Sequence, residues 1–411
     1  MKDTEWTKIL NWPGYRVYRH EIDAKAETLK LWVRRKRGNQ VIICSGCGRR
    51  CSGLHEVVER EVRDLPWGTY QTTVIVELYR VRCPDCGPKI EKVEQVPGKA
   101  HFSKRFEDAV GRACESAAAR RVAKDFELPE STVRAIDLRY LERWNQARRK
   151  PALKQMGVDE LFLGKRQKFW TVVSNLETGE PVWMGAERKQ ETLDGFFRTE
   201  LSRGKRSRIQ AVCVDMWAAF ANSVRKWAPQ SVIVYDRFHV MQHANQAVDE
   251  VRRAEFFRRG GNHRAIVKGK RWLLLTRWVN LTDAKRQMLN ELFSLNRRLM
   301  KAYLLKESLE QLWQQPNETG ARAYLWKWIE QLRWQRLPAF QKFAKLLVTH
   351  MDGLLNYYKV KVRFGVVEAI NGNLRLLLRR GRGYKNVRYL LLKAQRMAAT
   401  KTEFVAMKKA A

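Results

Sequence analysis

Two short cysteine turns place the strongest constraint on how this chain can fold. Residues 44–48 read CSGCG and residues 83–87 read CPDCG, so both follow the pattern C-x-x-C-G. A C-x-x-C turn lets two thiolates reach one ion, and the following glycine accepts the tight backbone. The alternatives are a redox dithiol, unliganded thiols, or Cys51 in place of one ligand. We expect a structural Zn²⁺ site with these ligands: Cys44, Cys47, Cys83 and Cys86.

The charge of the chain indicates what kind of partner it has. Its 411 residues contain 80 Lys and Arg against 43 Asp and Glu, a formal charge of +37 with a pI near 10.3. Such an excess predicts a polyanionic partner contacted over a long surface, by default nucleic acid. No apolar run reaches the roughly 18 residues of a membrane span, and the start lacks a secretory signal. We therefore expect a cytoplasmic protein without a membrane partner or a disulfide framework.

The hydrophobic pattern and the composition of the sequence change along the chain, which predicts a multidomain α/β protein. Short alternating stretches come first, followed by Ala-rich and Arg-rich helical periodicity, then strands mixed with helices, then a long helical stretch. The first part has too small a core to stand alone, so bound metal is expected to stabilise it. The expected parts are a zinc-binding β module at 1–100, a helix-turn-helix at 101–150, an α/β domain at 151–240 and 356–411, and a helical insertion at 241–355.

The second part carries the pattern of a helix-turn-helix. Apolar residues at helical spacing lie on both sides of Leu128-Pro129, and proline suits the start of the second helix. The N-terminal end of that second helix would face base edges, and the first helix would approach the phosphates. Any helical hairpin can imitate this pattern. The expected DNA contacts are Glu130, Ser131, Thr132, Arg134 and Asp137 for the bases, and Arg120, Arg121 and Lys124 for the backbone.

Three acids are candidates for a catalytic site. Asp159 ends the apolar run 156–158, and Asp215 ends the apolar run 211–214. An ionised side chain directly after a buried strand is costly unless it lies at the rim of the sheet or binds a cation. Together with Glu368, they could hold two divalent ions that activate a water or a 3′-hydroxyl for phosphodiester cleavage. The alternative is that they are ordinary caps or loop acids; Glu160 should point to the opposite side of the strand.

Glu368 belongs to the segment FGVVEAINGNLRLLLRRGRGY, residues 364–384. At 100° per residue, one helical face carries Glu368, Asn371, Gly372, Arg375, Arg379 and Arg382, and the opposite face carries Val366, Ile370, Leu374 and Leu377. Cations beside this acid would hold the phosphates of a strand being cut. The expected contacts are Arg375, Arg379, Arg380 and Arg382.

Together, these motifs resemble a DDE transposase of the ISL3 insertion-sequence family. The similarity covers nearly the whole chain, including GVDELFLGKRQKFWTVVSNLETGE, VCVDMWAAF and VIVYDRFHVMQHANQAVDEVRR. It implies a ribonuclease H-like domain interrupted by a helical insertion, with Asp159, Asp215 and Glu368 as catalytic ligands of Mg²⁺ or Mn²⁺. The segment Asp236-Arg-Phe-His239 resembles a D-x-x-H element of such enzymes. His239 would touch the DNA end or brace the site, or be purely structural.

The resemblance implies an enzyme of DNA recombination. Such a transposase binds the terminal inverted repeats of its element and target DNA, both double-stranded, then cleaves and transfers strands. We expect a homodimer on DNA, associated with the bacterial nucleoid. One alternative is a non-catalytic, sequence-specific regulator that keeps the zinc module and helix-turn-helix. Another is a recombinase with a nucleophilic Ser or Tyr, for which Tyr384 lies near the arginines.

Overall fold

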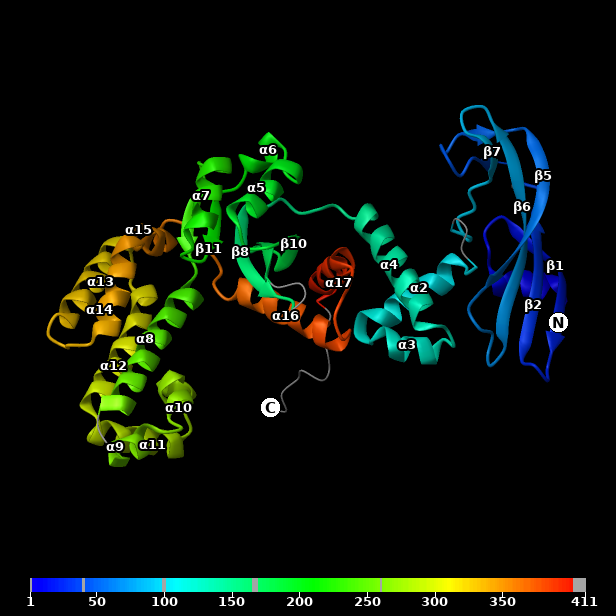
Figure 1. Ribbon diagram of the computed structural model, residues 1–411. Helices are drawn as coiled ribbons and strands as arrows, with labels where there is room; N and C mark the ends of the chain where they lie inside the picture. Colours follow the sequence, from blue (N-terminus) through cyan, green and yellow to red (C-terminus); the bar gives the residue numbers. More distant parts are fainter. Residues whose placement is uncertain (1, 39–40, 98–100, 165–168, 259–260, 402–411) are drawn as a thin grey trace. The chain divides into compact units, whose positions relative to one another are not determined.

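The chain forms two compact units (Figure 1). The structure, a computed structural model, describes residues 2–38, 41–97, 101–164, 169–258 and 261–401. One unit ends at Arg148, and the other comprises Arg149–Lys401. None of the helices in these ranges is both long and apolar enough to cross a lipid bilayer.

The first unit begins with a helix and a five-stranded sheet. The strand order is β1-β2-β6-β5, with β7 paired to β6, and β2 with β6 is the parallel pair. Inward residues of β6 alternate along the strand, as expected for a sheet with one buried face. They pack with Trp6, which is fully buried. The elements are α1 (Asp3–Leu10), β1 (Tyr15–Asp23), β2 (Thr28–Arg35), β5 (Leu54–Arg63), β6 (Gln71–Cys83) and β7 (Gly87–Ile90), beside the small pair β3 (Ile42–Ile43) and β4 (Arg50–Cys51).

Three helices complete the first unit: α2 (Lys104–Ser116), α3 (Ala119–Asp125) and α4 (Glu130–Ala147). Ser103 caps α2, because its side chain accepts a hydrogen bond from the Phe106 amide. Pro129 directly precedes α4, as the sequence predicted for the corner. Phe106, Val122, Val133 and Ile136 form the buried centre of this three-helix group.

The second unit contains a sheet with the strand order β10-β9-β8-β11-β12. The first three strands are antiparallel neighbours, whereas β11 and β12 run parallel to β8. This is the order of a ribonuclease H-like sheet, so the expected fold class is confirmed. The elements are β8 (Gln155–Phe162), β9 (Phe169–Asn175), β10 (Glu180–Ala186), α5 (Gln190–Thr199), α6 (Arg203–Arg206), β11 (Ala211–Val214), α7 (Ala218–Trp227) and β12 (Val232–Tyr235).

A helical insertion separates β12 from the end of the α/β domain; it begins directly after β12, and its C-terminal end contacts that strand. His350 Nδ1 lies 3.2 Å from the Tyr235 hydroxyl, and the Asn356 side chain donates to the Ile233 carbonyl at 2.9 Å. Its helices are α8 (Arg237–Arg258), α9 (Gly261–Val267), α10 (Arg271–Leu275), η1 (Trp278–Asn280), α11 (Asp283–Leu295), α12 (Arg297–Leu309), η2 (Glu310–Gln314), α13 (Glu318–Leu332), α14 (Pro338–Thr349), α15 (Met351–Leu355) and η3 (Asn356–Tyr358).

Two helices return to the sheet after the insertion. They are α16 (Val366–Arg380), which contacts β8, and α17 (Val387–Thr400), which contacts β10 (Figure 1). The close approach of α16 depends on Gly157 in β8, where a Cβ atom would lie 2.7 Å from a methyl group of Val367. The helix is therefore positioned by Val367, which is buried, and not by Val366, which is half-buried. This corrects one residue of the expected inner face; Ile370, Leu374 and Leu377 are buried as the sequence predicted.

Candidate active site and metal centre

The four cysteines of the two C-x-x-C turns converge on one point. All four Sγ atoms lie within 4.8 Å of one another, and those of Cys47 and Cys83 are 3.5 Å apart. The second turn joins β6 to β7, where Gly87 takes a left-handed backbone with φ of 69°. Cys51 lies outside this group. The structure thus brings the predicted ligands together in a set that fits a tetrahedral metal ion.

The close packing of these thiols shifts their pKa values in opposite directions. Burial raises the pKa of Cys83, but hydrogen bonds from the backbone amides of Asp85 and Cys86 lower it more, to about 7. The contact with Cys47, followed by burial, raises the pKa of Cys86 to about 12. Thiolates held this close repel each other, so all four stay ionised only beside a cation.

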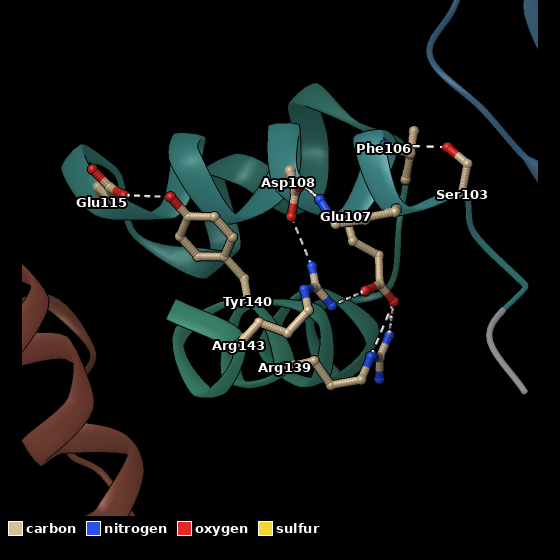
Figure 2. Close-up of polar contacts among 9 residues, drawn as sticks. Ser103, Phe106, Glu107, Asp108, Glu115, Arg139, Tyr140 and Arg143 are labelled. Atoms are coloured by element: carbon tan, nitrogen blue, oxygen red, sulfur yellow. Dashed lines mark hydrogen bonds and ion pairs between the residues drawn. The ribbon is translucent and has the colours of Figure 1, made fainter. Parts of the chain in front are cut away.

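An ion-pair network holds α2 against α4 (Figure 2). The Glu107 carboxylate is fully buried and accepts hydrogen bonds from Arg139 at 2.6 and 3.0 Å and from Arg143 at 2.6 Å. Arg143 also donates to Asp108 at 2.8 Å, and the Tyr140 hydroxyl donates to Glu115 at 2.8 Å. The three acids Glu107, Asp108 and Glu115 therefore have their partners within the helical group.

Most of the predicted DNA-contact residues of α3 and α4 are accessible. Arg120, Arg121, Lys124, Ser131 and Arg134 are exposed, whereas Thr132 is half-buried. Arg121 pairs with Asp125 within its own helix at 2.9 Å, and Arg134 pairs with Glu130 at 2.8 Å.

One predicted base contact in this region is wrong. Asp137 is fully buried, because it lies four residues after Val133 and shares the inner face of α4 with Val133 and Ile136. It cannot reach a base edge.

Asp159 and Asp215 lie beside each other at one end of the second sheet. The parallel register of β8 and β11 pairs Gly157 with Cys213, and each aspartate follows two residues later. His239, in the first turn of α8, stands between them: its Nε2 lies 3.2 Å from Asp159 Oδ1, and its Nδ1 lies 4.0 Å from Asp215 Oδ1. The sequence predicted that each aspartate follows an apolar strand and that the two converge, but it left the position of His239 open.

The carboxylates change the charge of the histidine between them. Burial lowers the pKa of His239, but the hydrogen bond with Asp159 and the charges of Asp215 and Asp236 raise it more, to about 9. The imidazole is therefore held as a cation against two acids. Asp236 itself is buried, and its Oδ1 accepts a hydrogen bond from the Phe238 amide at 2.9 Å.

Glu368 lies in the first turn of α16 and is exposed. Burial raises the pKa of Asp236, and the negative charges of Asp159 and Glu368 also raise it, which places all three acids in one electrostatic neighbourhood. The carboxylate oxygens of these acids do not all lie within 4.8 Å of one another. Among the described residues, only the four cysteines bring three or more possible metal ligands that close.

Asn371 is a site residue to which the sequence analysis assigned no function. It is only 2% exposed, and its amide donates to Asp159 Oδ2 at 2.6 Å. With His239 on the other oxygen, both oxygens of Asp159 are oriented by neighbouring side chains. Its spacing of three residues from Glu368 was the only signal in the sequence, since that spacing puts both residues on one helical face.

The arginines after Glu368 lie in the later turns of α16 and just beyond its end. Arg375 and Arg379 are exposed, and Arg380 is half-buried. Arg382 is exposed in the turn after the helix, where its φ is 52°. Nothing within 4 Å would meet a Cβ atom on Gly372, so this side of α16 is open.

Three family models match the chain in sequence order. The first describes the "zinc-finger of transposase IS204/IS1001/IS1096/IS1165" and matches residues 40–86. The second describes the "Helix-turn-helix domain of transposase family ISL3" and matches residues 91–141. The third is the DDE transposase model of the same family, described as "Transposase", and it matches residues 156–394.

Two curated relatives are similar over most of their length. The transposase for insertion sequence element IS1001 of Bordetella parapertussis is 32% identical over 387 residues, 93% of this chain and 95% of the relative. The transposase for element IS1557 of Mycobacterium tuberculosis is 28% identical, covering 85% of this chain and 84% of the relative. Among solved structures, a "Drosophila P element transposase strand transfer complex" matches with a TM-score of 0.38 and 11% identity, over 73% of this chain and 93% of that one.

Proposed function

This chain belongs to the ISL3 family of DDE transposases, and we propose that Asp159, Asp215 and Glu368 form its catalytic centre for cutting and joining DNA. The observation that carries the proposal is the pairing of β8 with β11, which sets Asp159 beside Asp215 at the sheet end that α16 also reaches. The family match extends over this central part, so a regulator that uses it for assembly alone is disfavoured.

The proposed centre has the chemistry of a site for Mg²⁺ or Mn²⁺. Its three candidate ligands are carboxylates, the donors that these hard cations prefer. When bound, the cations would polarise the scissile phosphate and lower the pKa of the attacking hydroxyl. Asn371 and His239 would keep both oxygens of Asp159 in a fixed orientation for this role.

The cationic face of α16 would hold the DNA strand at the centre. Arg375 and Arg379 are exposed in the turns that follow Glu368, and guanidinium groups bind phosphate oxygens bidentately. Arg380 and Arg382 would extend the contact. His239 lies at the same sheet end and would also approach the DNA end.

The first unit would recognise the ends of the element. We propose that Cys44, Cys47, Cys83 and Cys86 bind Zn²⁺ and that the exposed residues of α3 and α4 read the terminal inverted repeats, with the target DNA entering at the centre. Transposition must join two ends, so the proposed assembly is a homodimer on DNA. Because the substrate is DNA and the matched relatives are bacterial, the proposed place of action is the nucleoid.

The direct test is cleavage of an end-labelled duplex that carries the terminal inverted repeat of the encoding element. The full chain with Mg²⁺ or Mn²⁺ should release a 3′-hydroxyl at the end and then join it to a second duplex. No covalent protein–DNA adduct should form, because carboxylates and cations need none. A trapped adduct at Tyr384 or at a serine would contradict the proposal.

We expect Lys124→Ala to weaken DNA binding several-fold and to lower the slope of log affinity against log salt by about one, the effect of losing one phosphate contact. Lys124 is exposed on α3. The measurement is fluorescence anisotropy across a salt series. Lys25→Ala, an exposed lysine in the β1–β2 turn, is the matched control. An unchanged slope for Lys124→Ala, or an equal change in both variants, would remove α3 from the interface.

We expect Asn371→Ala to slow end cleavage roughly 10- to 100-fold, the usual cost of losing a residue that orients a metal ligand. The Mg²⁺ concentration for half-maximal rate should rise, and excess Mn²⁺ should restore part of the rate, while DNA affinity stays unchanged. Asn373→Ala, an exposed asparagine on the same helix, serves as the control. Equal loss in both variants, or no dependence on metal concentration, would contradict this positioning role.

A further inference from the structure

Two exposed aromatic rings and an arginine form a surface beside the catalytic acids, and we call Phe169, Arg188 and Trp217 the aromatic shelf. Trp217 is 43% exposed and Phe169 is 42% exposed. The Arg188 guanidinium lies over both rings, 4.7 Å from the Trp217 centroid and 5.8 Å from that of Phe169. Large aromatic side chains are usually buried, so an exposed pair with a shared cation needs an explanation.

The backbone around Arg188 is held in a form that glutamate rarely adopts. Glu187, just after β10, has a φ of 71°, in the left-handed region that favours glycine. Two hydrogen bonds maintain it: the Thr171 hydroxyl donates to the Glu187 carbonyl at 2.7 Å, and the Glu187 amide donates to the Phe169 carbonyl at 2.9 Å. Backbone strain that is fixed in this way is concentrated at functional sites. Here it directs the chain so that Arg188 reaches both rings while each ring stays partly exposed.

The shelf is joined to the catalytic acids on two sides. Trp217 follows Asp215 by two residues, at the N-cap of α7. Arg188 donates to Glu160 at 2.9 Å, and Glu160 directly follows Asp159 in β8. Glu160 therefore serves as an anchor for the arginine, which gives a role to the acid that was expected on the opposite side of the strand from Asp159. A guanidinium has five N–H donors, so Arg188 can bind a phosphate while it holds Glu160.

We propose that the aromatic shelf binds an unstacked base of the DNA strand that is cut, with Arg188 on the adjacent phosphate. Every base has a π face, and stacking on an aromatic side chain is sequence-tolerant. A strand lying over Asp159 and Asp215 would bring its bases to Trp217, and the charge of +37 favours DNA over an apolar protein surface as the occupant. The inference rests on the proposed function, since it needs DNA at the carboxylates.

The test is a double-mutant cycle of DNA-binding affinities, in which a shelf side chain and a DNA base are removed singly and together. The protein is the full chain in an Asp215→Asn background, in which no cleavage is expected. The duplex carries the terminal inverted repeat, with an abasic nucleotide placed in turn at each position flanking the scissile bond. Trp217→Ala should weaken binding of the intact duplex roughly tenfold to a hundredfold, the range for one base–aromatic stack. When the abasic nucleotide takes the place of the stacked base, the parent protein and its Trp217→Ala variant should bind the duplex with equal affinity.

Two further variants keep the result interpretable. Trp217→Phe retains a ring and should keep most of the affinity, so a folding defect in Trp217→Ala does not decide the outcome. Trp334→Ala removes a tryptophan that is 84% exposed elsewhere in the unit and should bind as the parent does.

An affinity loss for Trp217→Ala that is the same on every abasic duplex, or no loss at all, would overturn the proposal. A wild-type chain that binds this duplex but never cleaves it would contradict the proposed function instead, and the affinity cycle would still decide the role of the shelf.

Discussion

Asp215→Asn should lower the rate of end cleavage by more than about a hundredfold while leaving DNA affinity nearly unchanged. Residues that merely orient a metal ligand typically contribute 10- to 100-fold, so loss of a ligand charge should cost more. Asparagine retains an oxygen that can accept the Met216 amide, which donates to Asp215 at 2.6 Å. The fold should therefore persist. The measurement is single-turnover cleavage of the labelled end with Mg²⁺ and with Mn²⁺.

A matched variant separates this effect from a general loss of acidic charge. Asp283 lies on α11 with a side chain that is 93% exposed, and Asp283→Asn should cleave at the wild-type rate. Cleavage by Asp215→Asn at an undiminished rate would remove this residue from the catalytic centre. It would also revive the hypothesis of a non-catalytic DNA-binding regulator.

Cys83→Ser should abolish binding of the proposed zinc ion and destabilise the β module of the first unit. Structural zinc contributes about 10–16 kcal/mol in small metal-dependent domains. The sheet has its own buried core around Trp6 and Val76, larger than the sequence suggested, so the loss should be greatest at the cysteine end of the module. Cys83 ends β6 and is buried, so its loss affects both the metal and the hairpin to β7. Zinc content, measured by elemental analysis, should fall from about one equivalent to nearly none, and inverted-repeat binding should fall with it.

Cys51→Ser is the matched control because Cys51 lies in β4, near the centre but outside the four-sulfur group. It should keep its zinc and its melting temperature. If Cys51→Ser lost zinc and Cys83→Ser retained it, the ligand set would be wrong and the substitution of Cys51 for one ligand would be correct.

Local patterns in the sequence predicted what local geometry determines. A C-x-x-C-G turn fixes the separation of its own two sulfurs, and the proline at residue 129 fixes the corner before α4. Asp159 and Asp215 were recognisable because each directly follows a run of apolar strand residues. A charged side chain is costly there unless it lies at the rim of the sheet or binds a cation. The order of strands and helices in the second unit followed from the same periodicity.

Contacts between distant segments could not be predicted in this way. Asn371 and Asp159 are 212 residues apart, and their hydrogen bond depends on how α16 rotates as Val367 packs on Gly157. The burial of Asp137 likewise depends on which face of α4 meets α2. Arg188 reaches Trp217 through a left-handed residue that is not glycine, and no composition rule marks such a position.

The helical insertion returns to the strand that it leaves, and it shares one hydrophobic core with the catalytic sheet. Ile233 and Asn356 are joined although 123 residues separate them, so the intervening chain starts and finishes at the same strand. The entropy of closing a loop grows only with the logarithm of its length, so lengthening a surface loop within this excursion would alter the stability of the sheet little. A foreign module put in place of the whole excursion would instead remove His239 from between Asp159 and Asp215 and open the shared core, so only its outer loops are free to vary.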